Sequence, residues 1–138
     1  MQYEALTERV IRAAFNVHNA LGPGFLEKVY ENAMRIELIK QEINVKQQEP
    51  INVLYEGQLV GEYFADPFVE GRLVVELKAV QTLSKEHEVQ LVNYLAATGI
   101  EIGLLINFGP SVQVRRKYRD YRPRVLSTAV PISRETIS

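Results

Sequence analysis

Apolar residues recur at helical spacing in the first third of the chain. Between residues 3 and 21 they lie mostly three or four positions apart, at Leu6, Val10, Ala13, Ala14, Val17 and Leu21. This spacing predicts an amphipathic helix, which Gly-Pro-Gly at 22–24 ends. A second amphipathic helix is predicted over residues 25–40. Its expected core stripe consists of Leu26, Val29, Ala33 and Ile36.

Apolar and polar residues then alternate, which is the pattern of β-strands. Residues 43–55 alternate in this way, and Pro50 within them indicates an edge strand or a bulge. Glu-Gly pairs at 56–57 and 70–71 are turn signals that separate this strand from two further apolar segments. We therefore expect a three-stranded antiparallel meander from Ile43 to Val80.

Helix caps and one continuous apolar run define the next elements. Ser84 suits a helix N-cap and Gly99 suits a left-handed C-terminal residue, so a third helix is predicted between them. Residues 102–108 are almost all apolar, which is typical of a strand buried on both faces. Because a helical crossover leads to this strand, we expect it to pair in parallel with the strand at 73–78.

A last strand is predicted after Gly-Pro at 109–110, with Val112, Val114 and Tyr118. The element order is then α-α-β-β-β-α-β-β. This order predicts a three-layer α/β domain, a mixed sheet flanked by helices, as one domain over residues 1–138. Ser, Thr and Pro are frequent near the C-terminus, so we expect a frayed tail from about residue 125.

Composition excludes several classes of protein. The 138 residues are 46% hydrophobic and 24% charged, as in ordinary globular domains. Cysteine is absent, which excludes disulfides and cysteine-based zinc or nucleophile chemistry. No apolar run approaches the roughly 20 residues of a membrane span. We expect a cytoplasmic protein without membrane association. Its net charge of −1 argues against a dedicated high-affinity DNA binder.

Candidate chemistry gathers on the strand at 73–78. Its alternation places Glu76 and Lys78 on one face, beside Val74. Whether Asp66 on the preceding strand shares that face depends on the loop between the strands. A two-residue loop at 70–71 would set Asp66 opposite Val75, on the wrong side. A three-residue loop at 69–71, with a left-handed glycine in a bulge, would set Asp66 opposite Val74 and diagonal to Glu76. We expect the three-residue loop.

Two carboxylates and an ammonium group on an apolar sheet surface are costly unless they bind something. Oxygen ligands from Asp66 and Glu76 suit a hard divalent cation, Mg²⁺ or Mn²⁺. Lys78 could then stabilise the charge that develops on a phosphate, or help to activate a water. These three residues are the candidate catalytic residues.

The pattern D-(x)n-E-x-K formed by Asp66, Glu76 and Lys78 resembles the PD-(D/E)xK nuclease superfamily. The segment 24–30, Gly-Phe-Leu-Glu-Lys-Val-Tyr, is similar to the motif of the GxxExxY family within it. The resemblance extends from about residue 21 to 108. It implies a restriction-endonuclease-like fold and a metal-dependent nuclease that hydrolyses phosphodiester bonds of DNA or RNA.

The resemblance also implies roles for residues outside the strand pair. The implied metal ligands are Glu27, Asp66, Glu76 and the backbone carbonyl of Leu77. Tyr30 would support the site as a hydrogen-bonding group. From the residues alone, we would favour a structural role for Glu27, its interaction with the N-terminal end of the helix dipole. The resemblance reverses this preference.

Gln90 and Tyr94 are four residues apart and share a face of the third predicted helix. In the resembled superfamily, a QxxxY pair on the helix after the ExK strand supports the site by holding the lysine or a phosphate. In an ordinary helix the same pair would be a solvent-facing glutamine and an amphipathic tyrosine at the edge of the core. We favour the supporting role.

Basic residues crowd the final predicted strand, where Arg115, Arg116 and Lys117 are consecutive. Such a segment could follow the phosphate backbone of a nucleic acid. The alternative is a solvated edge strand whose charges prevent aggregation. Both interpretations stay open.

The rival to a nuclease is a catalytically silent module that keeps the fold and the site residues and acts with a partner protein or as a homodimer. Its support is the slightly acidic net charge and the small size, without a separate target-recognition domain. The sequence does not distinguish DNA from RNA as the ligand.

Overall fold

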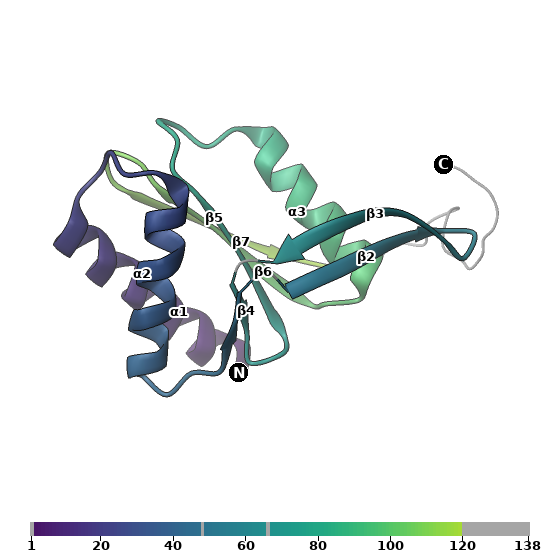
Figure 1. The fold of residues 1–138 in the computed structure, drawn as a ribbon, viewed down its shortest axis with the longest axis horizontal. Helices are drawn as coiled ribbons and strands as arrows, with labels where there is room; N and C mark the ends of the chain where they lie inside the picture. Colours follow the sequence, from purple (N-terminus) through teal and green to yellow (C-terminus); the bar gives the residue numbers. More distant parts are fainter. Residues whose placement is uncertain (1, 48, 66, 120–138) are drawn as a thin grey trace.

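The computed structural model describes residues 2–47, 49–65 and 67–119 (Figure 1). Its helices are α1 (Gln2–Leu21), α2 (Glu27–Lys40) and α3 (Lys85–Thr98). Its strands are β1 (Val45–Lys46), β2 (Glu49–Tyr55), β3 (Gln58–Ala65), β4 (Phe68–Val69), β5 (Leu73–Lys78), β6 (Ile102–Phe108) and β7 (Val112–Tyr118). The described helices are all too short or too polar to cross a membrane.

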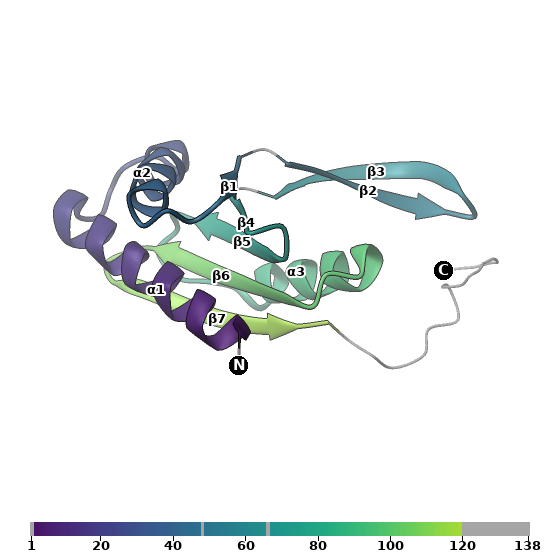
Figure 2. The same ribbon diagram turned by 90° about the horizontal axis from the view of Figure 1, so that it is seen from below.

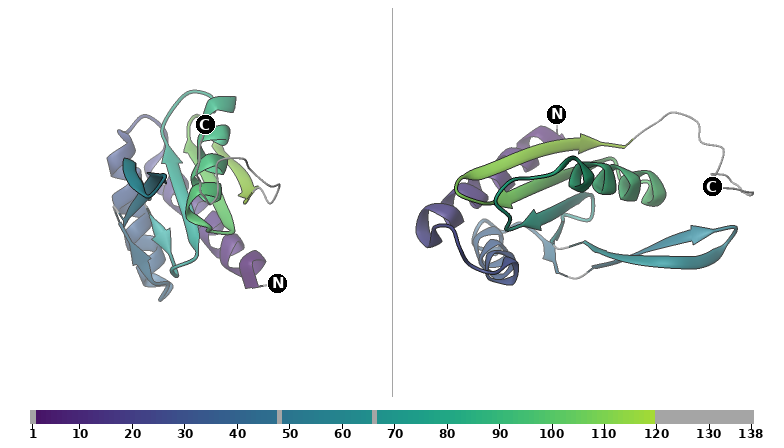
Figure 3. Two further views of the ribbon diagram at one scale, coloured as in Figure 1. Left: turned by 90° about the vertical axis from the view of Figure 1, so that its right-hand side faces the viewer. Right: turned by 90° about the horizontal axis from the view of Figure 1, so that it is seen from above.

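Five of these strands form one mixed sheet in the order β1-β4-β5-β6-β7. Strands β5 and β6 are parallel, and the other neighbouring pairs are antiparallel. Helices α1 and α2 cover one face of the sheet and α3 covers the other (Figure 3). The predicted three-layer α/β architecture, restriction-endonuclease-like, is therefore confirmed.

The alternation of side chains along β5 divides its residues between two cores. Leu73, Val75 and Leu77 are buried against α1 and α2. Val74 belongs to a second, smaller core under α3, together with Leu105 from β6. The two remaining residues of β5, Glu76 and Lys78, have the parity of Val74, so they also project from the α3 face.

Helix α2 has the predicted position, but the predicted core stripe is wrong. Leu26 is 79% exposed and Ile36 is 56% exposed, whereas Tyr30, Met34 and Leu38 are buried. The buried residues are four apart, so they form a stripe at helical spacing of their own. The sequence contains two apolar stripes on this helix, and packing against the sheet selects the second.

The predicted three-stranded meander is wrong in its pairing. Among the described strands, β2 and β3 pair with each other alone and form a separate two-stranded sheet. The five-stranded sheet instead receives the short strands β1 and β4, which pair with each other. The β2–β3 hairpin projects beyond the end of α3 (Figures 1 and 2). Its tip is the predicted turn, where Glu56 and Gly57 both have positive φ, as a type I′ hairpin turn requires.

The loop between β4 and β5 differs from the predicted three-residue loop at 69–71. Val69 pairs with Leu73 and Phe68 with Val74, so the loop consists of residues 70–72. Gly71 has the expected positive φ of 69°. The partner of Val74 is thus Phe68, where we expected Asp66. Asp66 itself lies outside the described residues.

The second half of the chain matches the prediction closely. Helix α3 begins after Ser84 and ends before Gly99, whose φ is 78°. All seven residues of β6 are buried, and β6 pairs in parallel with β5. Strand β7 forms an edge of the sheet. The tail expected from about residue 125 lies outside the described residues.

Candidate active site

Glu76 and Lys78 are brought together on β5. The Lys78 Nζ atom lies 3.4 Å from a carboxylate oxygen of Glu76, and the two side chains are 22% and 19% exposed. Their ion pair is therefore mostly shielded from solvent, yet still accessible to a ligand. Strand β4 pairs with β5 only at Leu73 and Val74. No strand of the described residues thus pairs with Glu76 and Lys78 on the β4 side of β5.

Asn107 is a buried polar residue beside this pair. It is the register partner of Lys78 on β6 and is fully buried. Its amide accepts a hydrogen bond from the Val80 N–H and donates one to the Val80 carbonyl, both at 2.9 Å. It also donates to the Gln113 side chain at 3.1 Å. Asn107 therefore fixes the path of the chain directly after Lys78.

Glu27 occupies the first turn of α2, where a carboxylate interacts well with the helix dipole. It is three residues before Tyr30 and seven before Met34, so it lies on the buried stripe that faces the sheet. Tyr30 stacks on Phe108 at the end of β6, with ring centroids 4.5 Å apart. Because β5 is parallel to β6, the first turn of α2 lies at the end of the sheet where Lys78 is.

The hydrogen-bond partners of Tyr30 lie in the loop before α2, and its supporting role at the metal site stays a prediction. Its hydroxyl donates to the Gly22 carbonyl at 2.6 Å and accepts from the Phe25 N–H at 3.2 Å. Gly24 within this loop has a φ of 103°, which favours glycine. Tyr30 thus fixes the loop that precedes α2.

The complete predicted metal site is not visible in the described residues. Among residues 2–47, 49–65 and 67–119, no three His, Asp or Glu side chains lie close enough to hold one metal ion. Asp66 lies outside these residues. The Leu77 side chain is buried on the α1–α2 face, so only its backbone carbonyl could be a ligand. The predicted ligand set stays a prediction.

Gln90 and Tyr94 lie on one flank of α3. Glu88 on this helix contacts β7, and Gln90 is about 200° away from it round the helix. The flank that carries Gln90 and Tyr94 is therefore turned away from β7, toward the β5 side of the sheet. Gln90 is exposed and Tyr94 is half-buried. Their supporting role at the site stays a prediction.

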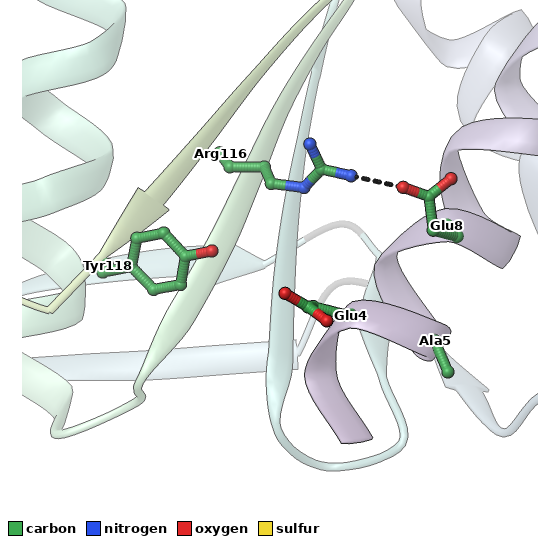
Figure 4. A pocket seen from close by; sticks show the side chains of 5 residues that line it. All are labelled: Glu4, Ala5, Glu8, Arg116 and Tyr118. Atoms are coloured by element: carbon green, nitrogen blue, oxygen red, sulfur yellow. Dashed lines mark hydrogen bonds and ion pairs between the residues drawn. The ribbon is translucent and has the colours of Figure 1, made fainter. Parts of the chain in front are cut away.

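The basic segment on β7 is divided between the two faces of the sheet. Arg115 and Lys117 project toward α3 and form ion pairs with Glu88, at 3.5 and 2.6 Å. Arg116 projects to the opposite face and pairs with Glu8 of α1 at 2.9 Å (Figure 4). The three residues therefore do not form one cationic cluster.

The electrostatics of Glu88 follow from these neighbours. Its hydrogen bond with Lys117 holds the pKa of the Glu88 carboxyl below its ordinary value. Partial burial opposes this shift, and the charges of Lys117, Lys85 and Arg115 add to it. Glu88 is thus an ionised partner for two cations on the same face of the sheet as Glu76.

Asn107 and Glu88 are two structurally informative residues that the sequence reasoning did not single out. Asn107 is the one polar side chain in the apolar run at 102–108, which is itself a signal of a buried hydrogen-bonding role. Glu88 could not be assigned a partner, because nothing in its local sequence indicates β7.

A family model for the PD-(D/E)XK nuclease superfamily matches residues 4–119. The chain therefore belongs to this superfamily. The match spans every strand of the five-stranded sheet and includes the Glu76–Lys78 pair. No curated protein and no solved structure matches the chain.

Proposed function

We propose that the protein is a metal-dependent nuclease that hydrolyses phosphodiester bonds of nucleic acid. The observation that carries this proposal is the shielded Glu76–Lys78 pair on β5, in a chain of the PD-(D/E)XK nuclease superfamily. A carboxylate beside an ammonium group combines a cation ligand with a phosphate-binding group.

The donor set suits a hard cation, because it contains only oxygen atoms. Glu76 would hold Mg²⁺ or Mn²⁺ together with Asp66, Glu27 and the Leu77 carbonyl. Placement of Glu27 on the sheet-facing stripe of α2 supports its inclusion. A bound divalent cation supplies Lewis acidity and lowers the pKa of water.

The chain's own groups bind and orient the substrate. The Lys78 ammonium can donate hydrogen bonds to the phosphate oxygens, and its charge offsets the negative charge that develops there. Asn107 fixes the chain that follows Lys78, which limits the positions its ammonium group can reach. We propose that Gln90 and Tyr94 assist from α3.

Within the superfamily, we propose membership of the GxxExxY family. Each residue of the motif at 24–30 has a physical role that supports the assignment. Gly24 adopts a positive φ, Glu27 faces the sheet from the first turn of α2, and Tyr30 fixes the preceding loop. We also propose that the protein is cytoplasmic.

The proposal is tested by assaying purified protein on single- and double-stranded DNA and RNA. We expect cleavage with Mg²⁺ or Mn²⁺ and none with a chelator. Calorimetric titration with Mn²⁺ should show binding to the wild type and at least 10-fold weaker binding to Asp66→Ala, since a carboxylate ligand is lost. Cation binding without cleavage of any of the four substrates would contradict the nuclease proposal.

The two faces of β7 allow a matched test of nucleic-acid binding. We propose that Arg115 and Lys117, on the α3 face with Glu76, contact phosphates, and that Arg116 contributes less. The double variant Arg115→Ala/Lys117→Ala should weaken binding several-fold and flatten its salt dependence. Arg116→Ala removes a charge from the same strand on the opposite face, so its binding should be nearly unchanged. Binding of both variants is measured by anisotropy titrations over a range of salt. If Arg116→Ala lost as much affinity per charge removed as the double variant, this assignment would be wrong.

A catalytically silent module acting with a partner protein is the second candidate. It is favoured by the projecting β2–β3 hairpin, on which Leu54, Leu59 and Val60 are each more than half exposed. Exposed apolar groups of this kind are typical of protein interfaces. The cleavage assay above distinguishes the two candidates.

A further inference from the structure

A cavity of about 510 Å³ lies at the end of the sheet where β5 and β6 end. Three chain segments form its walls, at 23–26, 79–81 and 108–110. The second wall begins at Ala79, which directly follows Lys78. One wall of the cavity is therefore the direct continuation of the strand that carries the Glu76–Lys78 pair. The volume of the cavity is in the range of small-molecule sites.

Each wall is fixed by a side chain from elsewhere in the fold. Tyr30 holds the first wall through the Gly22 carbonyl and the Phe25 N–H. Asn107 holds the second through both backbone groups of Val80. His18 holds the third through a hydrogen bond of 2.9 Å with the Gly109 carbonyl. The cavity is thus largely preformed, which lowers the cost of binding a ligand.

Space at the second and third walls is tight. A Cβ atom on Gly109 would lie 2.7 Å from the Val80 carbonyl oxygen and 2.9 Å from the Asn107 amide nitrogen. Both distances are shorter than real Cβ contacts, so only glycine allows this approach. The close packing of these two walls is a further sign that the cavity has a defined shape.

The chemistry of the lining indicates an uncharged, flat ligand. All ten lining residues are uncharged: Pro23, Gly24, Phe25, Leu26, Ala79, Val80, Gln81, Phe108, Gly109 and Pro110. Phe25 is 47% exposed and Leu26 is 79% exposed. An uncharged lining offers a phosphate no cation, whereas an exposed aromatic ring can stack on a planar heteroaromatic ring.

We propose that this cavity binds an unpaired nucleobase of the nucleic acid whose phosphate lies at Glu76 and Lys78. The inference rests on the proposed nuclease function and names its substrate class. Ala79 in the second wall directly follows Lys78 in the chain, so a nucleic acid whose phosphate binds at Lys78 would have a neighbouring base at this end of the sheet. A base inside the cavity cannot be paired, so the preferred substrate is single-stranded nucleic acid or a frayed end.

The test measures binding separately from cleavage. A single-stranded oligonucleotide is titrated with chelator present, and fluorescence anisotropy is recorded. Phe25→Ala should weaken binding roughly 5- to 100-fold, the effect of losing one base-stacking contact. Phe25→Trp should retain the affinity. The matched control is Phe15→Ala, since Phe15 is 45% exposed on α1 and does not line the cavity.

An abasic substitution in the oligonucleotide separates stacking from a structural effect. Moved along the strand, one abasic position should weaken binding to the wild type and should not weaken binding to Phe25→Ala further. Equal affinities of wild type and Phe25→Ala for every oligonucleotide would overturn the nucleobase site. So would a wild type that binds no single-stranded nucleic acid. Binding that follows the expected pattern without cleavage in Mg²⁺ or Mn²⁺ would overturn the nuclease function alone.

Discussion

Replacing Lys78 by alanine is expected to lower the turnover number for phosphodiester cleavage about 100- to 1000-fold, the usual cost of losing one group that stabilises transition-state charge. The affinity for Mn²⁺ should change little, because an ammonium group has no lone pair with which to bind a cation. The turnover number comes from steady-state kinetics, and the cation affinity from calorimetry.

Lys40→Ala is the matched control for this variant. The Lys40 Nζ atom also lies 3.4 Å from a glutamate oxygen, that of Glu37, but its side chain is 68% exposed at the end of α2. Removing Lys40 breaks an ion pair of the same length far from β5 along the chain, so cleavage should be unaffected. A Lys78→Ala protein that cleaves as fast as Lys40→Ala would remove Lys78 from the chemistry and leave it only as the partner of Glu76.

The elements of this fold that could be predicted from sequence are those encoded by local patterns. Helix α3 has a capping residue at Ser84 and a left-handed glycine at Gly99, and both ends were confirmed. Strand β6 is a continuous apolar run, and its burial on both faces and parallel pairing with β5 were also confirmed. The helix caps and the apolar run each lie within about 15 residues of sequence, and the parallel pairing follows from the single helical crossover between β5 and β6.

Pairing between distant segments could not be predicted in the same way. Residues 43–55 have one alternating pattern, yet they divide into β1 and β2, which join different sheets. The register of β4 against β5 depends on one residue in the loop, and a three-residue loop at 70–72 is as compatible with the sequence as one at 69–71. Such choices are made by packing against the rest of the domain.

The candidate site shows the same division. Placement of Glu76 and Lys78 together follows from strand alternation, which is local. The separation of Arg116 from Arg115 and Lys117 also follows from alternation, but their pairing with Glu8 and Glu88 depends on where two helices pack. A run of like charges in a strand is therefore weak evidence for a charged patch.

Asn107→Leu is expected to lower the free energy of unfolding by about 2–4 kcal/mol. Leucine has nearly the same size, but it cannot replace the hydrogen bonds to the Val80 N–H and carbonyl. Each buried polar group left without a partner costs about 1–3 kcal/mol. The Gln113 side chain also loses a donor. Chemical denaturation of the two proteins, compared at equal m-value, measures the difference.

The matched control is Asn93→Leu, the same chemical change at an exposed position of α3. Its effect should stay within about 0.5 kcal/mol, as for most surface substitutions. Because Asn107 fixes the chain directly after Lys78, Asn107→Leu should also lower the turnover number under conditions where the variant is fully folded, and Asn93→Leu should not. If both variants unfolded at the same denaturant concentration, the buried amide would not be holding Val80, and the preformed wall beside the candidate active site would lose its physical basis.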